Sequence, residues 1–170
     1  MNLEIKSIVN NEDIFLSYLD QLTNTYTYKK LDWIHTLKKE YDRYLHWSLC
    51  FNNDKIVAFS CIQKHVFDDD TVRILTRTWF DNSIRCNNGS LWRETPVAPM
   101  AKDQIDWLKG TQFRRAIFTL EPHRGYDLLK FLSKKINQRA GTNFVPKKDK
   151  IKTWRTSPIE SYQLYAEHLL

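Results

Sequence analysis

Glycine is scarce in this chain, with four residues among 170. So few glycines argue against a fold built on many tight turns. No apolar run approaches the ~20 residues that span a bilayer. The first residues, MNLEIKSIVNNED, lack the basic start and the apolar core of a signal peptide. We therefore expect a globular cytoplasmic protein with no membrane partner.

Several enzyme signatures are also missing. Neither a Walker loop nor a Rossmann glycine fingerprint occurs, and no Ser/His/Asp or Cys/His pattern stands out. Cys50, Cys61 and Cys86 have no metal-like spacing and the five histidines are scattered, so we expect no metal site. Free cysteines in strands act as small apolar residues, which fits a reducing compartment. The aspartates at 68–70 are interpreted as a solvated turn rather than a cation site.

Positive charge is concentrated in the C-terminal part of the chain. Residues 1–100 hold 12 basic and 13 acidic side chains, whereas residues 101–170 hold 14 and 7, so the net charge of +6 belongs to the second part. Such a region favours an anionic partner, either nucleic acid or a phosphorylated cofactor, and the alternative is a solvated lysine-rich surface. Phe113, Phe144 and Trp154 are interleaved with it, a combination that binds single strands. The basic residues are Arg114, Arg115, Arg124, Lys130, Lys134, Lys135, Arg139, Lys147, Lys148, Lys150, Lys152 and Arg155.

Hydrophobic periodicity predicts the element order β-α-α-β-β-β-α-β-α-β-β. Short turns such as NNDK predict antiparallel pairing, and the strand–helix–strand crossover predicts one parallel pair. In the strand at 72–80, strict alternation separates Arg73, Leu75, Arg77 and Trp79 from the even-numbered positions. The predicted strands are 3–9, 46–51, 56–67, 72–80, 112–120 and two in 151–169, with a turn or bulge at Pro158; the helices are about 12–22, 28–44, 98–109 and 126–139.

This order, with the NDKIVAFSCIQ hairpin, the LTRTWFDNSIR strand and the polar loop before a helix, resembles the GCN5-related N-acetyltransferase (GNAT) superfamily. The likeness is greatest to small GNAT-like proteins of bacteriophage and marine bacterial genomes that lack a clear glycine-rich pyrophosphate loop. The resemblance implies one GNAT-like α/β domain over residues 1–170. Its central sheet would be mixed and mostly antiparallel, with helices on both faces.

The same resemblance implies an acyl-CoA-dependent N-acyltransferase that moves an acetyl group from acetyl-CoA to an amine acceptor. Coenzyme A phosphates would bind the loop before a helix N-terminus, where backbone N–H groups favour anions. That loop has a single glycine, Gly89, which stands one residue later than the glycine of the family pattern. The alternative is a plain turn at Asn88-Gly89. The implied cofactor-binding residues are Thr78, Trp79, Phe80, Arg85, Asn87, Asn88, Gly89 and Ser90.

The resemblance also implies catalytic groups. A backbone N–H on a bulge around residues 78–80 would polarise the thioester carbonyl, Glu121 or His123 would act as base, and Tyr126 would protonate the leaving thiolate. The alternative is that Glu121 and His123 are ordinary loop residues and that Tyr126 only begins a helix. A cleft is expected between the fourth and fifth strands, bordered by Trp79, Phe80, Arg85 and Tyr126.

Two other functions stay open from the sequence. One is nucleic-acid binding through the basic, aromatic C-terminal region. The other is a catalytically inactive GNAT fold that serves as an interaction module.

Overall fold

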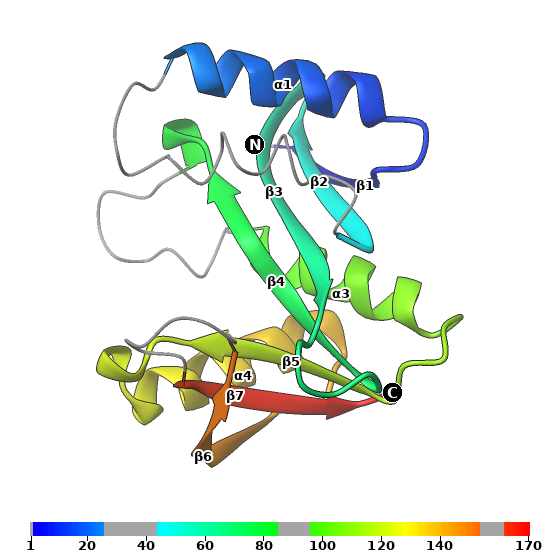
Figure 1. Ribbon diagram of the computed structural model, residues 1–170. Helices are drawn as coiled ribbons and strands as arrows, with labels where there is room; N and C mark the ends of the chain where they lie inside the picture. The colour runs from blue at the N-terminus through cyan, green and yellow to red at the C-terminus, as the bar shows by residue number, and fades with distance from the viewer. Residues whose placement is uncertain (1, 26–43, 85–95, 154–161) are drawn as a thin grey trace.

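The computed structural model describes residues 2–25, 44–84, 96–153 and 162–170. Its centre is a seven-stranded sheet in the order β1-β2-β3-β4-β5-β7-β6 (Figure 1). Neighbouring strands are antiparallel except β4 and β5, which are parallel, so the predicted mixed sheet is confirmed. The strands are β1 (Leu3–Ser7), β2 (His46–Asn52), β3 (Lys55–Lys64), β4 (Thr71–Phe80), β5 (Arg115–Leu120), β6 (Val145–Lys152) and β7 (Tyr162–Leu169).

Helices lie on both faces of the sheet, as predicted (Figure 1). Gly141, in the left-handed conformation with φ 68°, follows the last helix and ends it. None of the described helices has the length and apolar character needed to cross a membrane. The predicted helix at 28–44 and the bulge at Pro158 fall outside the described residues, apart from Tyr44. The elements are α1 (Glu12–Thr25), α3 (Val97–Leu108), α4 (Tyr126–Ala140) and two short 3₁₀ turns, η3 (Asn82–Ile84) and η4 (Pro122–Arg124).

Two cores hold the helices to the sheet. On the α1 side, Phe15 packs on Trp47 and Phe59 of β2 and β3 with ring centroids 4.9 and 5.3 Å away. We call this the α1-side core. On the opposite face, aliphatic residues of α3 and α4, such as Ile105 and Leu129, pack on β4, β5 and β7 and form the α3-side core. The sheet is therefore covered on both faces, which fixes where a site can open.

The aspartate turn at 68–70 has a structural role. The Asp68 carboxylate accepts hydrogen bonds from Thr71 Oγ1 at 2.6 Å and Asp70 N at 2.9 Å, and it forms an ion pair with Arg115 at 3.2 Å. The Thr71 bond, the Asp70 bond and the charge of Arg115 lower the pKa of Asp68. Asp68 therefore orders the turn between β3 and β4.

The two described cysteines are buried thiols. Cys50 and Cys61 are free and have no solvent exposure, as expected of small apolar residues in strands. Burial raises the pKa of both thiols to about 12. Neither is a thiolate nucleophile at neutral pH.

His65 lies just after β3, and the folded state depends on whether its imidazole is protonated. It is 5% exposed, and its Nδ1 accepts a hydrogen bond from the backbone N–H of Phe67 at 3.1 Å, which requires an unprotonated Nδ1. Burial, together with the positive charges of Arg73 and Arg115, lowers the pKa of His65. The folded state therefore holds the neutral imidazole.

We expect the free energy of unfolding to fall as the pH drops from about 7.5 to 5.5. A lowered folded pKa means that the unfolded chain takes up protons first below about 6.5, so stability is lost as pH falls through that range. Urea unfolding at both pH values measures the loss, which is at most about 1.4 kcal/mol per pH unit for one group. His65→Asn keeps an acceptor and should reduce the slope; His168, whose pKa burial also lowers, retains part of it. His123→Gln, at an exposed position, is the matched control, and an equal slope in all three proteins would contradict the prediction.

Candidate functional site

Strands β4 and β5 are paired over only part of their length. Their parallel ladder covers residues 71–73 of β4 and 115–117 of β5. Beyond it β4 continues to Phe80 and β5 to Leu120, so the strands separate toward their C-terminal ends (Figure 1). The splay implied by the resemblance is present. It leaves the facing edge of β4 after Arg73 without a strand partner among the described residues.

Strand β4 also bulges away from regular pairing with β3. The register shifts on both sides of the pair Thr76–Cys61. Leu75 and Arg77 have positive φ angles of 54° and 51°, a conformation that costs roughly 1–3 kcal/mol for a residue with a side chain. Gln104 of α3, which is fully buried, accepts a hydrogen bond from the Leu75 backbone N–H at 2.8 Å. Helix α3 therefore supports the bulged part of β4 through this hydrogen bond.

The bulges correct the prediction for the two faces of β4. The strict alternation predicted for β4 is wrong, because each bulge adds a residue that shifts the pattern by one. Leu75 packs against the α3-side core, to which Val72 and Ile74 of the other predicted face also belong, and Leu75 and Thr76 both line a pocket with the two arginines. One of the two bulges lies between the pairs Thr76–Cys61 and Trp79–Phe59, beside residues 78–80, where the resemblance placed the carbonyl-polarising N–H; that role stays a prediction.

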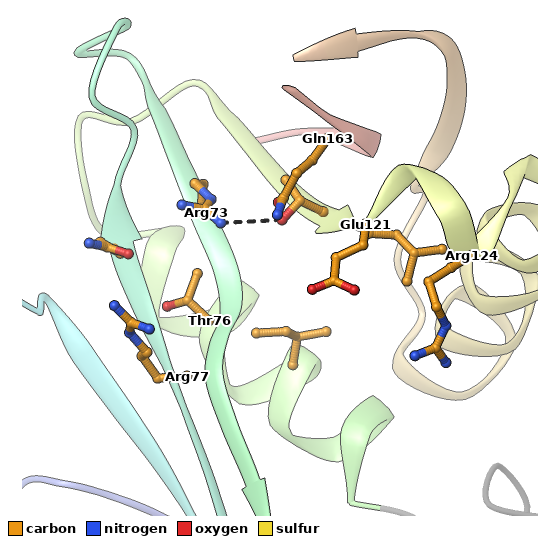
Figure 2. Close-up of a pocket in the computed structure, with 10 residues that line it drawn as sticks. Arg73, Thr76, Arg77, Glu121, Arg124 and Gln163 are labelled. Atoms are coloured by element: carbon orange, nitrogen blue, oxygen red, sulfur yellow. Dashed lines mark hydrogen bonds between the residues drawn. The ribbon is translucent and has the colours of Figure 1, made fainter. Parts of the chain in front are cut away.

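A pocket of about 320 Å³ opens where the two strands separate (Figure 2). This volume suits a small molecule. In Figure 2, Glu121 extends from the end of β5 into the gap toward β4, and Arg124 lies on the same side. The wall residues are Gln63 of β3; Arg73, Leu75, Thr76 and Arg77 of β4; Thr119 and Leu120 of β5; Glu121 and Arg124 at η4; and Gln163 of β7.

Two guanidinium groups share the β4 wall. Arg73 Nη2 donates to Thr119 Oγ1 at 3.3 Å, the dashed line in Figure 2, and Arg77 Nε donates to Tyr44 Oη at 3.3 Å. Burial, together with the neighbouring positive charge of Arg77, lowers the pKa of Arg73 to about 10. Arg73 remains protonated at neutral pH, so this wall is positively charged.

The opposite wall carries the only carboxylate among the pocket residues. Glu121 follows β5 directly and precedes the 3₁₀ turn η4, where the backbone N–H of Arg124 donates to its carbonyl at 3.0 Å. His123 Nε2 lies 3.4 Å from Glu121 Oε2 but is not part of the pocket wall. Of the two predicted bases, Glu121 is therefore the one placed at the pocket.

Other predicted site residues lie away from the pocket wall. Tyr126 begins α4, and its hydroxyl donates to the Pro146 carbonyl at 3.5 Å. Trp79 is buried in the α1-side core and Phe80 packs against the α3-side core. Thr78 Oγ1 donates to a backbone carbonyl of the bulge at 2.7 Å. The roles assigned to these residues stay predictions.

The predicted phosphate loop falls in a part of the chain that the structure does not describe. Its residues are Arg85, Asn87, Asn88, Gly89 and Ser90, and Cys86 and Trp154 are likewise outside the described ranges.

Three residues of the basic, aromatic set expected for nucleic acid have structural roles. Phe113 and Phe144 are 7% and 2% exposed, so their rings are core residues and cannot stack on bases. Arg115 forms ion pairs with Asp68 and Glu167. Phe113, Phe144 and Arg115 therefore no longer support the nucleic-acid interpretation.

The functional residues that sequence reasoning missed are the polar side chains on the strands of the pocket. Arg73 and Arg77 were noted only as one face of a strand, and Gln163 was not singled out. Their signal was present: two arginines four residues apart within a long strand that has no other charged residue are uncommon, because buried charge is costly.

No family model matches the sequence, and no curated protein matches it. Solved structures do share its fold. An acetyltransferase of the GNAT family from Staphylococcus aureus superposes with a TM-score of 0.55 at 11% identity over 99% of both chains. A mutant of a spermidine N-acetyltransferase from Vibrio cholerae gives 0.55 at 7% identity over 98% of this chain and 93% of that one. An aminoglycoside acetyltransferase in complex with coenzyme A and kanamycin gives 0.55 at 8% identity over 99% and 95%. The chain therefore has the GNAT fold, which acetyltransferases share.

Proposed function

We propose that the protein is an acyl-CoA-dependent N-acyltransferase that transfers an acetyl group from acetyl-CoA to an amine. One observation carries the proposal: the β4–β5 ladder ends at residue 73 of β4, and a pocket with a carboxylate opens at that point beside the bulged strand. The fold shared with acetyltransferases, one of them a coenzyme A complex, supports the same interpretation.

The residues at the splay fit the pantetheine arm of coenzyme A. That arm carries amide groups, and the facing edge of β4 beyond Arg73 presents backbone groups that no described strand pairs. An extended molecule with amides can add to such an edge by main-chain hydrogen bonds. When bound, acetyl-CoA supplies an acetyl group activated as a thioester.

Glu121 is the proposed base of the transfer. An amine is protonated at neutral pH and becomes a nucleophile only after it loses a proton. The Glu121 carboxylate extends into the gap toward β4, so it can accept that proton from an amine in the pocket (Figure 2). His123, 3.4 Å away and more exposed to solvent, can then pass the proton to water.

Acetyl-CoA is expected to raise the melting temperature of the protein, because a ligand that binds only the folded state stabilises it by mass action. At a concentration 100 times Kd the gain is about 2.7 kcal/mol. A thermal-shift titration with acetyl-CoA measures it, beside a short single-stranded DNA at two salt concentrations. A salt-sensitive shift with DNA and none with millimolar acetyl-CoA would overturn the proposal in favour of nucleic-acid binding.

A further inference from the structure

We propose that the pocket between β4 and β5 takes an amine that also carries an acidic group, a carboxylate or a phosphate. This inference rests on the proposed acyl transfer and narrows the class of its acceptor.

The charges of the pocket wall are the first argument. The residues that line the pocket include three arginines, Arg73, Arg77 and Arg124, and a single carboxylate, Glu121. Among these arginines, the charged form of Arg73 is the most disfavoured, because partial burial has removed water from it and the positive charge of Arg77 repels it. Guanidinium forks match carboxylate and phosphate oxygens in geometry, so an anionic group suits this wall.

The placement of these charges is the second argument. Arg73 and Arg77 stand on the β4 wall, whereas Glu121 stands across the gap at the end of β5 (Figure 2). A molecule that spans the gap meets guanidinium groups at one end and a carboxylate at the other. An amine beside Glu121 and an oxyanion beside the β4 arginines satisfy both ends. The bulges contribute directly, since they bring Leu75, Thr76 and Arg77, which are consecutive in the sequence, to the same pocket wall.

An unpaired acceptor atom is the third argument. Gln163 Oε1 is buried and has no hydrogen-bond partner among the described residues, although the side chain lines the pocket. A buried polar atom without a partner is costly, so the site is incomplete in the free protein. An N–H or O–H of a bound molecule would satisfy it. A polar, multiply hydrogen-bonding acceptor therefore fits this wall better than an apolar amine.

The phosphates of coenzyme A do not account for the β4 arginines. In the GNAT-like arrangement they would bind the loop after β4, whereas Arg73 precedes the end of β4, Phe80, by seven residues. At about 3.3 Å per residue that separation is roughly 20 Å along the strand. Arg73 lies at the closed end of the splay, where it forms the last β4–β5 pair with Ile117. The pocket is also too small, at about 320 Å³, for a polynucleotide.

The test uses a matched set of amines: 4-aminobutyrate, 3-aminopropyl phosphate, 4-aminobutanol and putrescine. They carry a carboxylate, a phosphate, a hydroxyl and a second ammonium at nearly the same distance from the amine. We expect one of the two acids to raise the melting temperature, without acetyl-CoA, at a concentration at least tenfold below that needed for the alcohol. Putrescine should bind most weakly. The better of the two acids identifies the oxyanion. Equal or better binding of the alcohol or putrescine, or no binding by any of the four, would overturn the inference.

Two variants assign the effect to the pocket. Arg73→Gln and Arg77→Gln, at the two arginines of the β4 wall, should each weaken binding of the preferred acid about tenfold and leave binding of the alcohol unchanged. Arg77→Gln guards against the case in which the buried Arg73 variant fails to fold. Lys134→Gln removes one positive charge from α4, away from the pocket, and should change neither. If the lysine variant loses as much affinity as the arginine variants, a general field and not the pocket binds the acid, and the inference is wrong.

The outcome is separable from that of the proposed function. Binding of the acid is measured without acetyl-CoA, and acetyl-CoA binding is measured without the acid. A protein that binds and uses acetyl-CoA but prefers putrescine keeps the proposed function and loses the acidic acceptor. A protein that binds the acid in an Arg73-dependent way but ignores acetyl-CoA keeps the acid site and loses acyl transfer.

Discussion

Replacing Glu121 with Gln is expected to lower kcat of the proposed acyl transfer by about 10²–10⁴-fold, the usual contribution of a positioned general base. The amide has nearly the same shape but cannot take the proton from the acceptor amine. Since Glu121 is more than half exposed and its side chain bridges no core elements, the fold should be retained. Steady-state kinetics measure the loss, and KM for acetyl-CoA should remain within about twofold because the carboxylate acts on the amine.

The neighbouring histidine provides the matched control. His123→Gln changes a side chain 3.4 Å from the carboxylate that is not part of the pocket wall, so kcat should fall by less than about tenfold. Raising the pH should restore part of the activity of Glu121→Gln, because more of the amine is then already deprotonated. A larger loss in the His123 variant, or no rescue at high pH, would transfer the role of base away from Glu121.

Much of the fold was readable because it depends on local patterns. The turn NNDK joins β2 and β3, and apolar spacing at Phe15 and Leu19 marks the buried face of α1. The parallel pair followed from the helix between β4 and β5. These features depend on a few neighbouring residues, and the chemistry of those residues is sufficient to specify them.

The details of β4 could not be read in the same way. Nothing in the letters RILTRTWF marks the positive φ angles of Leu75 and Arg77, since neither residue favours that conformation. The bulge depends on Gln104, a side chain 29 positions away that accepts the Leu75 N–H. The predicted faces of β4 were therefore wrong for a tertiary reason.

The candidate site was only partly readable for the same cause. Glu121 could be predicted because it directly follows a strand, at the position where the GNAT resemblance implies a base. The structure places it at the pocket. Gln163 reaches the pocket from β7, which pairs with β5 from the far end of the chain. Assigning it needed the sheet order, which a residue pattern does not contain.

The largest stability effect is expected at Asp103 of α3. One carboxylate oxygen, Oδ2, accepts hydrogen bonds from two residues of β2, His46 Nε2 at 2.8 Å and Ser48 Oγ at 2.6 Å. His46 and Ser48 are 2% and 0% exposed, and Trp107 stacks on the imidazole with ring centroids 5.2 Å apart. This network holds α3 against β2. The next residue of α3, Gln104, is the one that supports the β4 bulge.

Asp103→Ala is expected to lower the free energy of unfolding by about 2–4 kcal/mol, because each buried donor left without a partner costs roughly 1–3 kcal/mol. Urea unfolding measures it. Asp103→Asn keeps a neutral acceptor and should cost about half as much. The matched control is Asp106→Ala, one turn along α3, whose exposed ion pairs with Lys102 and Lys109 are worth at most about 1 kcal/mol.

A second comparison separates the hydrogen bonds from the general packing of α3. Combining Asp103→Leu with His46→Phe and Ser48→Ala removes acceptor and donors together, so no buried polar group is left unpaired. This triple variant should recover more than half of the stability lost in Asp103→Ala. If it is as unstable as the single variant, or if Asp106→Ala is equally harmful, the network does not hold the helix. Because Gln104 adjoins Asp103, loosening this contact should also reduce acyl transfer, which ties the stability of α3 to the geometry of the β4 bulge.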